Sequence, residues 1–195
     1  MTDDNKNNII NFPGSPKTGV LQFRVELLLM PLPVWRRIIV PGNYSFWDLH
    51  VAIQDTMGWD DRHLHQFTLD QPSGGGRLRL GIPDDSGFYD VDEVLPGWEH
   101  RVSQYMKPGA LPILYTYDFG DEWQHEVLLE ASLPSDNSQV LPRCLAGAGN
   151  CPPEDSGGPA GCADLLMTDL SDDFVPEGVI FDDPRERWTR AFRND

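Results

Sequence analysis

The sequence has 195 residues, with 15 Lys and Arg against 31 Asp and Glu, which gives a formal net charge of -16. This length suits one domain of ordinary size with a tail. The 39% of hydrophobic and 10% of aromatic residues exclude a disordered chain. The acidic charge disfavours direct binding of nucleic acid, because a protein that binds the phosphate backbone needs a basic surface.

No apolar run reaches the roughly 18 residues of a membrane-spanning helix, and the polar N-terminal residues lack a signal-peptide pattern. We therefore expect a cytoplasmic protein that does not enter a membrane. The three cysteines are Cys144, Cys151 and Cys162. An odd count in a reducing compartment predicts free thiols or metal ligands and no structural disulfide.

Residues 1–17 are polar and end in Pro-Gly-Ser-Pro, which predicts a flexible leader before a single domain at residues 18–195. Apolar residues then alternate with polar ones over residues 21–29, the pattern of a strand with one buried face. Residues 34–40 predict a second strand, antiparallel to the first because the connection is so short.

Helical spacing of apolar residues predicts a helix over residues 46–57 with one stripe packed on the sheet. Ser45 is the expected N-cap, Asp48 can complete a capping box, and Gly58 ends the helix. A strand with His63 and His65 on one face follows; such a pair can chelate one ion, although hydrogen-bonded or exposed histidines are commoner.

After a short edge strand at residues 77–82, the next clear pattern is a hairpin at residues 113–130 with its turn at Gly120-Asp121. His125 falls on the apolar face of its second strand, where a neutral imidazole needs a hydrogen-bond partner or a metal. We expect four aromatic side chains to be largely buried: Trp59, Phe67, Phe119 and Trp123.

Residues 142–162 contain so much Gly and Pro that we expect no regular structure there. Long irregular segments in a compact domain are usually functional or pinned, so we expect this one to fold across the end of the hairpin. Two candidate ligand sets follow. A closed zinc site would use His65, His125, Cys144 and Cys151. A second candidate site comprises His63, Asp118, Asp121, Glu154 and Asp155. Within it, Asp118, Asp121 and Glu154 without thiolates would favour magnesium, calcium or manganese.

Together these elements predict an α+β fold. We expect a curved, mainly antiparallel sheet of six to eight strands, with helix 46–57 packed on its apolar face. Short C-terminal helices are expected near residues 162–170 and 184–192.

Several segments carry a family resemblance: residues 34–38, 58–67, 117–125, Cys144, 151–155 and 157–161. In this order they resemble the plasmid pRiA4b ORF-3-like family, whose members are often labelled transposon-passenger or TnpR-type resolvases. The resemblance implies an α+β domain carried on plasmids, mobile elements and chromosomes, with no established activity. Ser156 and Cys162 depart from the family pattern and are not counted as ligands.

A recombinase needs a nucleophile flanked by arginines that clamp the scissile phosphate, and the sequence has no such constellation. We favour a non-enzymatic interaction or regulatory module that binds protein and has a structural polar or metal cluster. One alternative is a metal-dependent hydrolase acting on a phosphodiester, with Asp118, Asp121 or Glu154 joining His65 and His125 around the ion. Another is an acidic mimic or anti-defence factor that binds a nucleic-acid-handling protein.

Overall fold

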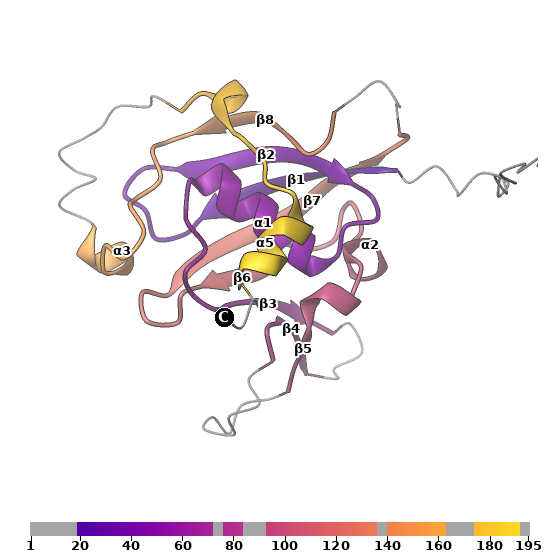
Figure 1. Cartoon of the computed structure of the whole chain (residues 1–195), viewed down its shortest axis with the longest axis horizontal. Helices are drawn as coiled ribbons and strands as arrows, with labels where there is room; N and C mark the ends of the chain where they lie inside the picture. Colours follow the sequence, from indigo (N-terminus) through magenta and orange to yellow (C-terminus); the bar gives the residue numbers. More distant parts are fainter. Residues whose placement is uncertain (1–18, 72–75, 84–92, 136–139, 163–173, 192–195) are drawn as a thin grey trace, which may run out of the picture.

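The computed structural model describes residues 19–71, 76–83, 93–135, 140–162 and 174–191. Within these ranges eight strands form one open sheet in the order β5-β4-β3-β6-β7-β1-β2-β8 (Figure 1). All neighbouring strands are antiparallel except β4 and β5, which are parallel. The predicted α+β class and mainly antiparallel sheet are therefore confirmed. The strands are β1 (Val20–Leu27), β2 (Val34–Pro41), β3 (His65–Asp70), β4 (Arg77–Gly81), β5 (Val94–Pro96), β6 (Ile113–Tyr117), β7 (Trp123–Leu133) and β8 (Arg143–Ala148).

The long strands β1 and β7 pair at the centre of the sheet, and both alternate between buried and partly exposed residues. Phe23 and Val25 of β1 and Val127 of β7 are fully buried on the same face. This alternation is the period-2 pattern of the sequence, because successive side chains of a strand point to opposite faces.

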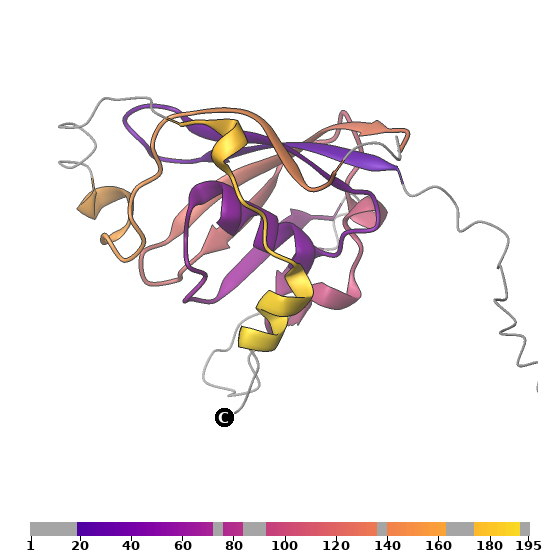
Figure 2. The ribbon, with the colours of Figure 1, turned by 45° about the horizontal axis from the view of Figure 1, so that its top comes forward.

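Helix α1 (Phe46–Met57) packs on that apolar face, and the strands curve around it (Figure 2). Its ends follow the local rules expected from the sequence. The Asp48 amide donates to Ser45 Oγ at 3.2 Å, and the Ser45 amide donates to Asp48 Oδ2 at 2.8 Å. Gly58 ends the helix with φ 77°, a left-handed conformation that glycine adopts without strain.

Helix α5 (Pro184–Ala191) covers the side of α1 that faces away from the sheet (Figure 1). For this reason α1 is buried on nearly all sides, whereas the sequence indicated one apolar stripe. The polar His50 and Gln54 are buried on its sheet side, where both contact Tyr115 of β6. Helix α5 confirms the C-terminal helix expected at residues 184–192.

Four shorter helices complete the described structure: η1 (Gly97–Glu99), α2 (Val102–Tyr105), α3 (Gly158–Gly161) and η2 (Pro176–Gly178). Most of the helix expected at residues 162–170 and the whole leader at residues 1–17 lie outside the described residues. Among the described residues, no helix combines the length and the apolar character needed to cross a membrane.

The expectation that residues 142–162 lack regular structure was wrong for β8, which pairs with β2 at the edge of the sheet. Strand pairing uses backbone groups, and in β8 the small residues have a packing role. A Cβ at Gly147 would overlap the ring of Phe174, so glycine lets that ring lie over the strand. The same ring covers the buried Arg36 guanidinium at 3.6 Å.

The expectation of a buried Phe119 was also wrong, since this residue is 53% exposed. Strand β6 ends at Tyr117, and Asp118 turns the chain with φ 55°, so Phe119 lies in the turn and not on a strand face. Trp59, Phe67 and Trp123 are buried as predicted.

Candidate functional site

A polar cluster lies where the β6–β7 turn meets the segment before α3, and Figures 1 and 2 both show α3 beside this turn. The cluster consists of His63, just before β3, Asp118, just after β6, and Asp155, in the loop after β8. His63 Nε2 lies 2.6 Å from Asp155 Oδ1 and 3.6 Å from Asp118 Oδ2. Three segments that are distant in sequence therefore converge on one point.

Neighbouring contacts hold the loop in place. Glu154 accepts hydrogen bonds from the Asp60 amide at 2.7 Å, from the Arg62 amide at 3.2 Å and from the Tyr117 hydroxyl. Two residues further on, the Gly157 amide donates to Asp121 Oδ2 at 2.9 Å. The loop is thus pinned through its acids and its backbone, which satisfies polar groups that an irregular segment cannot pair within itself.

The electrostatics of the cluster favour a protonated His63. Partial burial disfavours the imidazolium, but the hydrogen bond to Asp155 and the charges of Asp118, Asp155 and Glu154 outweigh burial and raise the pKa of His63. In this form His63 and Asp155 are an ion pair at the protein surface.

The four residues of the zinc set are placed differently. In the part of the chain that the structure describes, His63, Asp118 and Asp155 are the group whose ligand atoms lie within 4.8 Å of one another, and His65, His125, Cys144 and Cys151 form no such group. Burial raises the pKa of the Cys144 thiol, and raises that of Cys151 to about 12. Both thiols therefore stay protonated near neutral pH.

His65 and His125 lie on the same side of the sheet, since both rings contact Tyr115. Among the described residues neither ring nitrogen of His125 has a hydrogen-bond partner, although the backbone of Tyr115 and Trp123 lies close enough to favour the charged form slightly. Burial dominates and lowers the pKa of His125 to about 3. The hydrogen-bond partner expected for a neutral His125 is therefore absent among the described residues.

A buried relay, which the sequence did not reveal, runs from α1 to the loop before β3. Gln54 Nε2 donates to the Tyr115 hydroxyl at 2.8 Å, and Tyr115 Oη lies 2.8 Å from His50 Nδ1. Burial raises the pKa of Tyr115 well above its ordinary value, so its hydroxyl keeps its proton and donates to Nδ1. His50 Nε2 then carries the imidazole proton and donates to Asp61 Oδ1 at 2.8 Å.

The rings of His50 and His65 are stacked beneath this relay, 3.5 Å apart and 8° from parallel. Burial lowers the pKa of both rings well below 6.5, with smaller contributions from Arg187 for His50 and from His50 for His65. Both imidazoles are therefore neutral. The four-residue spacing of His50 and Gln54 on a predicted helix was the one available signal for this relay.

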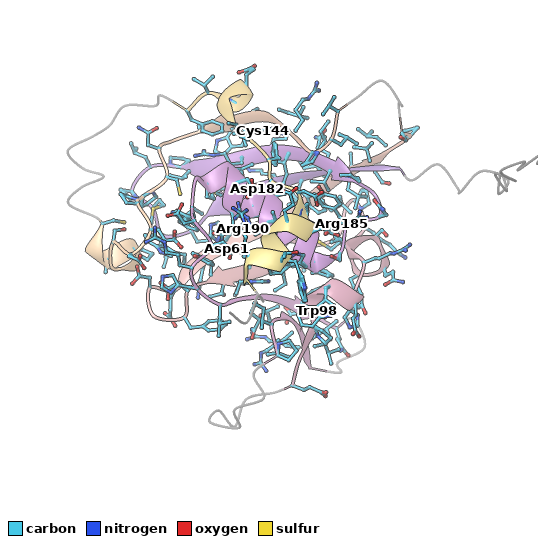
Figure 3. All side chains as sticks on the ribbon, in the orientation of Figure 1. Asp61, Trp98, Cys144, Asp182, Arg185 and Arg190 are labelled. Carbon is cyan, nitrogen blue, oxygen red and sulfur yellow. The ribbon has the colours of Figure 1, made fainter. Side chains whose placement is uncertain are left out.

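A charged network joins α5 to the same region. Arg187 binds Asp55 at 2.5 Å and Asp182 at 2.8 Å, and lies 3.8 Å from Asp61. Asp61, Asp182 and Arg190 come together beside α5 in Figure 3 and line a hollow of about 360 Å³ with Trp59, Asp60 and Arg187.

A second hollow, of about 630 Å³, lies between α1, η1 and α5, and we call it the tryptophan groove. Trp188 of α5 meets Trp47 of α1 and Trp98 of η1 edge to face, with ring centroids 5.2 and 4.7 Å apart. Figure 3 shows Trp98 and Arg185 at this side of the molecule. The tryptophan groove is lined by Trp47, Trp98 and Trp188 and by the charged Asp48, Glu99, Arg101 and Arg185, with further small and polar residues.

The fold and these sites define an α+β protein with an open, mixed eight-stranded sheet, one buried central helix and a loop pinned to the sheet end. The chain belongs to the plasmid pRiA4b ORF-3-like protein family, which it matches over residues 19–177, so the resemblance seen in the sequence is confirmed.

Two relatives extend this assignment. The uncharacterized protein y4hQ of Sinorhizobium fredii (strain NBRC 101917 / NGR234) is 33% identical over 146 residues, which cover 73% of this chain and 69% of the relative. The crystal structure of MM3350, a protein of unknown function from Methanosarcina mazei Go1, has 36% sequence identity and a TM-score of 0.70, and the match covers 88% of this chain and 97% of that one. The likeness extends from sequence to fold.

Proposed function

We propose that this chain is a non-enzymatic interaction module that binds a basic segment of a partner protein in the tryptophan groove. The observation that carries the proposal is the convergence of Trp47, Trp98 and Trp188 on one hollow of about 630 Å³. Tryptophan and arginine are the residues most enriched among the energetic centres of protein interfaces.

The groove offers both apolar contact area and charged groups. Trp98 is 36% exposed, so the edge of the aromatic cluster is accessible to a partner. Asp48 and Glu99 can pair with a lysine or arginine of the bound segment, and a cation can also lie against a tryptophan face. Arg101 and Arg185 supply donors for the backbone carbonyls of that segment.

The net charge of -16 favours a basic partner over an acidic one, because the field of the whole molecule attracts positive charge and speeds encounter. The walls of the groove are held in place before binding. Trp47 Nε1 donates to the Pro184 carbonyl at 3.0 Å, and Arg187 ties α5 to Asp55 of α1. A rigid site loses less entropy on binding, which favours affinity.

A peptide selection tests the proposal. We expect the intact protein to enrich, from a random display library, peptides that combine Lys or Arg with an apolar residue, and the affinity to fall as salt is raised. Trp98→Ala should weaken the best peptide by at least about tenfold. Leu111→Ala is the matched control, because it removes an 86% exposed leucine that is not among the groove residues; it should leave the peptide affinity unchanged. Failure to enrich any peptide, or equal binding to Trp98→Ala, would refute the proposal.

Metal-dependent hydrolysis is the second candidate function, and the cluster of His63, Asp118 and Asp155 is the observation that favours it. Its first requirement is a bound ion with room for water.

A further inference from the structure

We propose that His63, Asp118 and Asp155 bind one divalent transition-metal ion at the end of the β6–β7 hairpin. This site is separate from the tryptophan groove, and it does not depend on the proposed protein interaction. Its ligands differ from the thiolate set that the sequence indicated.

The geometry is that of three ligands around one point. One nitrogen of His63 and one oxygen each of Asp118 and Asp155 lie within 4.8 Å of one another. Metal bonds to imidazole and carboxylate are about 2.0–2.2 Å long, so an ion between such atoms needs only small side-chain movements. The 2.6 Å hydrogen bond between His63 and Asp155 would be exchanged for two bonds to the ion.

Asp118 supplies a second, independent indication of a ligand. The residue is only 9% exposed, and its Oδ1 accepts the Gly120 amide at 2.9 Å. Its Oδ2 accepts no hydrogen bond from the described residues and lies 3.6 Å from His63 Nε2. The Asp118 side chain is 12% exposed and its Oδ2 is directed into the cluster, where the negative charge is stabilised by a positive partner; the His63 imidazolium or a bound metal ion can fill that place.

The backbone supports the same arrangement. Asp118 and Asp155 both have left-handed backbone conformations, with φ 55° and 59°, a region that aspartate enters more readily than most non-glycine residues. Glu154, the neighbour of Asp155, is fixed by the Asp60 and Arg62 amides. The ligands are therefore positioned by rigid neighbours before an ion arrives.

The donor set selects the class of ion. Imidazole suits zinc, copper, iron and nickel, whereas carboxylates alone suit magnesium, calcium and manganese. One imidazole with two carboxylates therefore favours a first-row transition ion, with zinc bound more tightly than manganese and magnesium bound least. Because the His63 and Asp155 side chains are 34% and 49% exposed, solvent can fill the remaining coordination positions. The site is thus of the open type, with three protein ligands and water.

Calorimetric titration of the full-length, metal-free protein with Zn²⁺, Mn²⁺ and Mg²⁺ tests this site. We expect one Zn²⁺ per chain, weaker Mn²⁺ binding and the weakest response to Mg²⁺. Asp118→Asn and Asp155→Asn keep the side-chain shape and one acceptor oxygen. Each should weaken Zn²⁺ binding by at least about tenfold, because removal of a group that only supports a metal ligand already costs about that much affinity.

Two matched variants act as controls. Asp60→Asn removes a neighbouring acid whose side chain is 67% exposed, and Cys151→Ser removes the thiol nearest the loop acids in sequence. Neither should change Zn²⁺ affinity.

Melting curves without metal should show that Asp118→Asn and Asp155→Asn remain folded. If either one does not, the absorption spectrum of the Co²⁺ complex of the wild-type protein decides instead, since oxygen and nitrogen ligands lack the thiolate charge-transfer band. Absence of saturable Zn²⁺ binding, full affinity in folded Asp118→Asn and Asp155→Asn, or a thiolate band would overturn the proposal.

Discussion

Arg187 on α5 and Asp55 on α1 form a buried ion pair, with Nη2 and Oδ1 2.5 Å apart and side chains that are 12% and 4% exposed. The second nitrogen of this guanidinium, Nη1, lies 3.8 Å from Asp61. Burial raises the pKa of Asp55 and of Asp61 to about 6, even though Arg187 acts to lower both. Arg187 therefore ties α5, which forms one wall of the tryptophan groove, to α1 and to the loop before β3.

Arg187→Met should destabilise the protein by about 3–5 kcal/mol at pH 7.5, because Asp55 and Asp61 would stay buried without their counter-charge. Urea unfolding measures the loss. The cost should shrink below pH 6, where both carboxyl groups take up a proton.

Arg190→Met is the matched control for that variant. Arg190 lies on α5 like Arg187 and also binds Asp182, but its side chain is 66% exposed. Solvent-exposed ion pairs contribute only about 0–1 kcal/mol to stability. Equal losses for Arg187→Met and Arg190→Met would show that the buried network does not hold α5.

Stability should fall as the pH drops from 7 toward 4. His50, His65 and His125 are buried with lowered pKa values, so each contributes stability that is complete above about pH 6.5 and is lost as the unfolded chain takes up protons, at about 1.4 kcal/mol per pH unit. Asp55 and Asp61 act in the opposite direction. Their contribution is complete below about pH 3.8 and is lost as the pH rises through about 6. His63, whose pKa is raised, acts in the same direction as these two carboxyl groups. Glu130 and Asp182, whose carboxyl pKa values are lowered by Arg37 and Arg187, act with the three buried histidines, so acidification brings a net loss.

His125→Leu isolates one of these histidines. Leucine is close to histidine in volume and removes two buried nitrogens that lack partners among the described residues, so stability at pH 7 should be equal or higher. Between pH 7 and 4, the free energy of unfolding of this variant should also fall less steeply with decreasing pH than that of the wild type. An unchanged pH dependence would mean that His125 is not a neutral buried group.

Gly158→Ala should detach the loop from the β6–β7 turn. Gly158 has φ 68°, and an added Cβ would overlap the carbonyl oxygen of Asp121. Hydrogen exchange of the amides of residues 154–161 should become faster, and stability should drop by about 1–3 kcal/mol. Gly178→Ala is the control, since a Cβ there meets no atom within 4 Å. Protection that is equal in the two variants would argue against the pinned loop.

Local rules explain why part of the fold could be predicted from the sequence. Ser45, Asp48 and Gly58 determine the ends of α1 through contacts within a few residues, and alternation determines the buried faces of β1 and β7. Strand β8 could not be predicted in this way, because its pairing with β2 uses the backbone and its small residues serve the approach of Phe174.

The candidate site residues were predictable only where they lie in a recognisable sequence motif. His63, Asp118 and Asp155 lie in three of the segments that carry the family resemblance, and the structure brings them together. The relay depends on Tyr115 of β6, which lies more than sixty residues from Gln54 and His50, and the tryptophan groove depends on α5, whose Trp188 reaches Trp47 of α1 across more than a hundred residues. No local pattern encodes a contact of that range.

The six tryptophan indole N–H signals test the groove most directly in a two-dimensional NMR titration with the best peptide from the display selection. Trp47, Trp98 and Trp188 line the tryptophan groove, whereas Trp35, Trp59 and Trp123 do not and act as internal controls. We predict that the peptide shifts the first three signals in a saturable way and leaves the other three in place. Shifts confined to Trp35, Trp59 or Trp123, or no shift at saturating peptide, would contradict the assignment of this groove as the binding site.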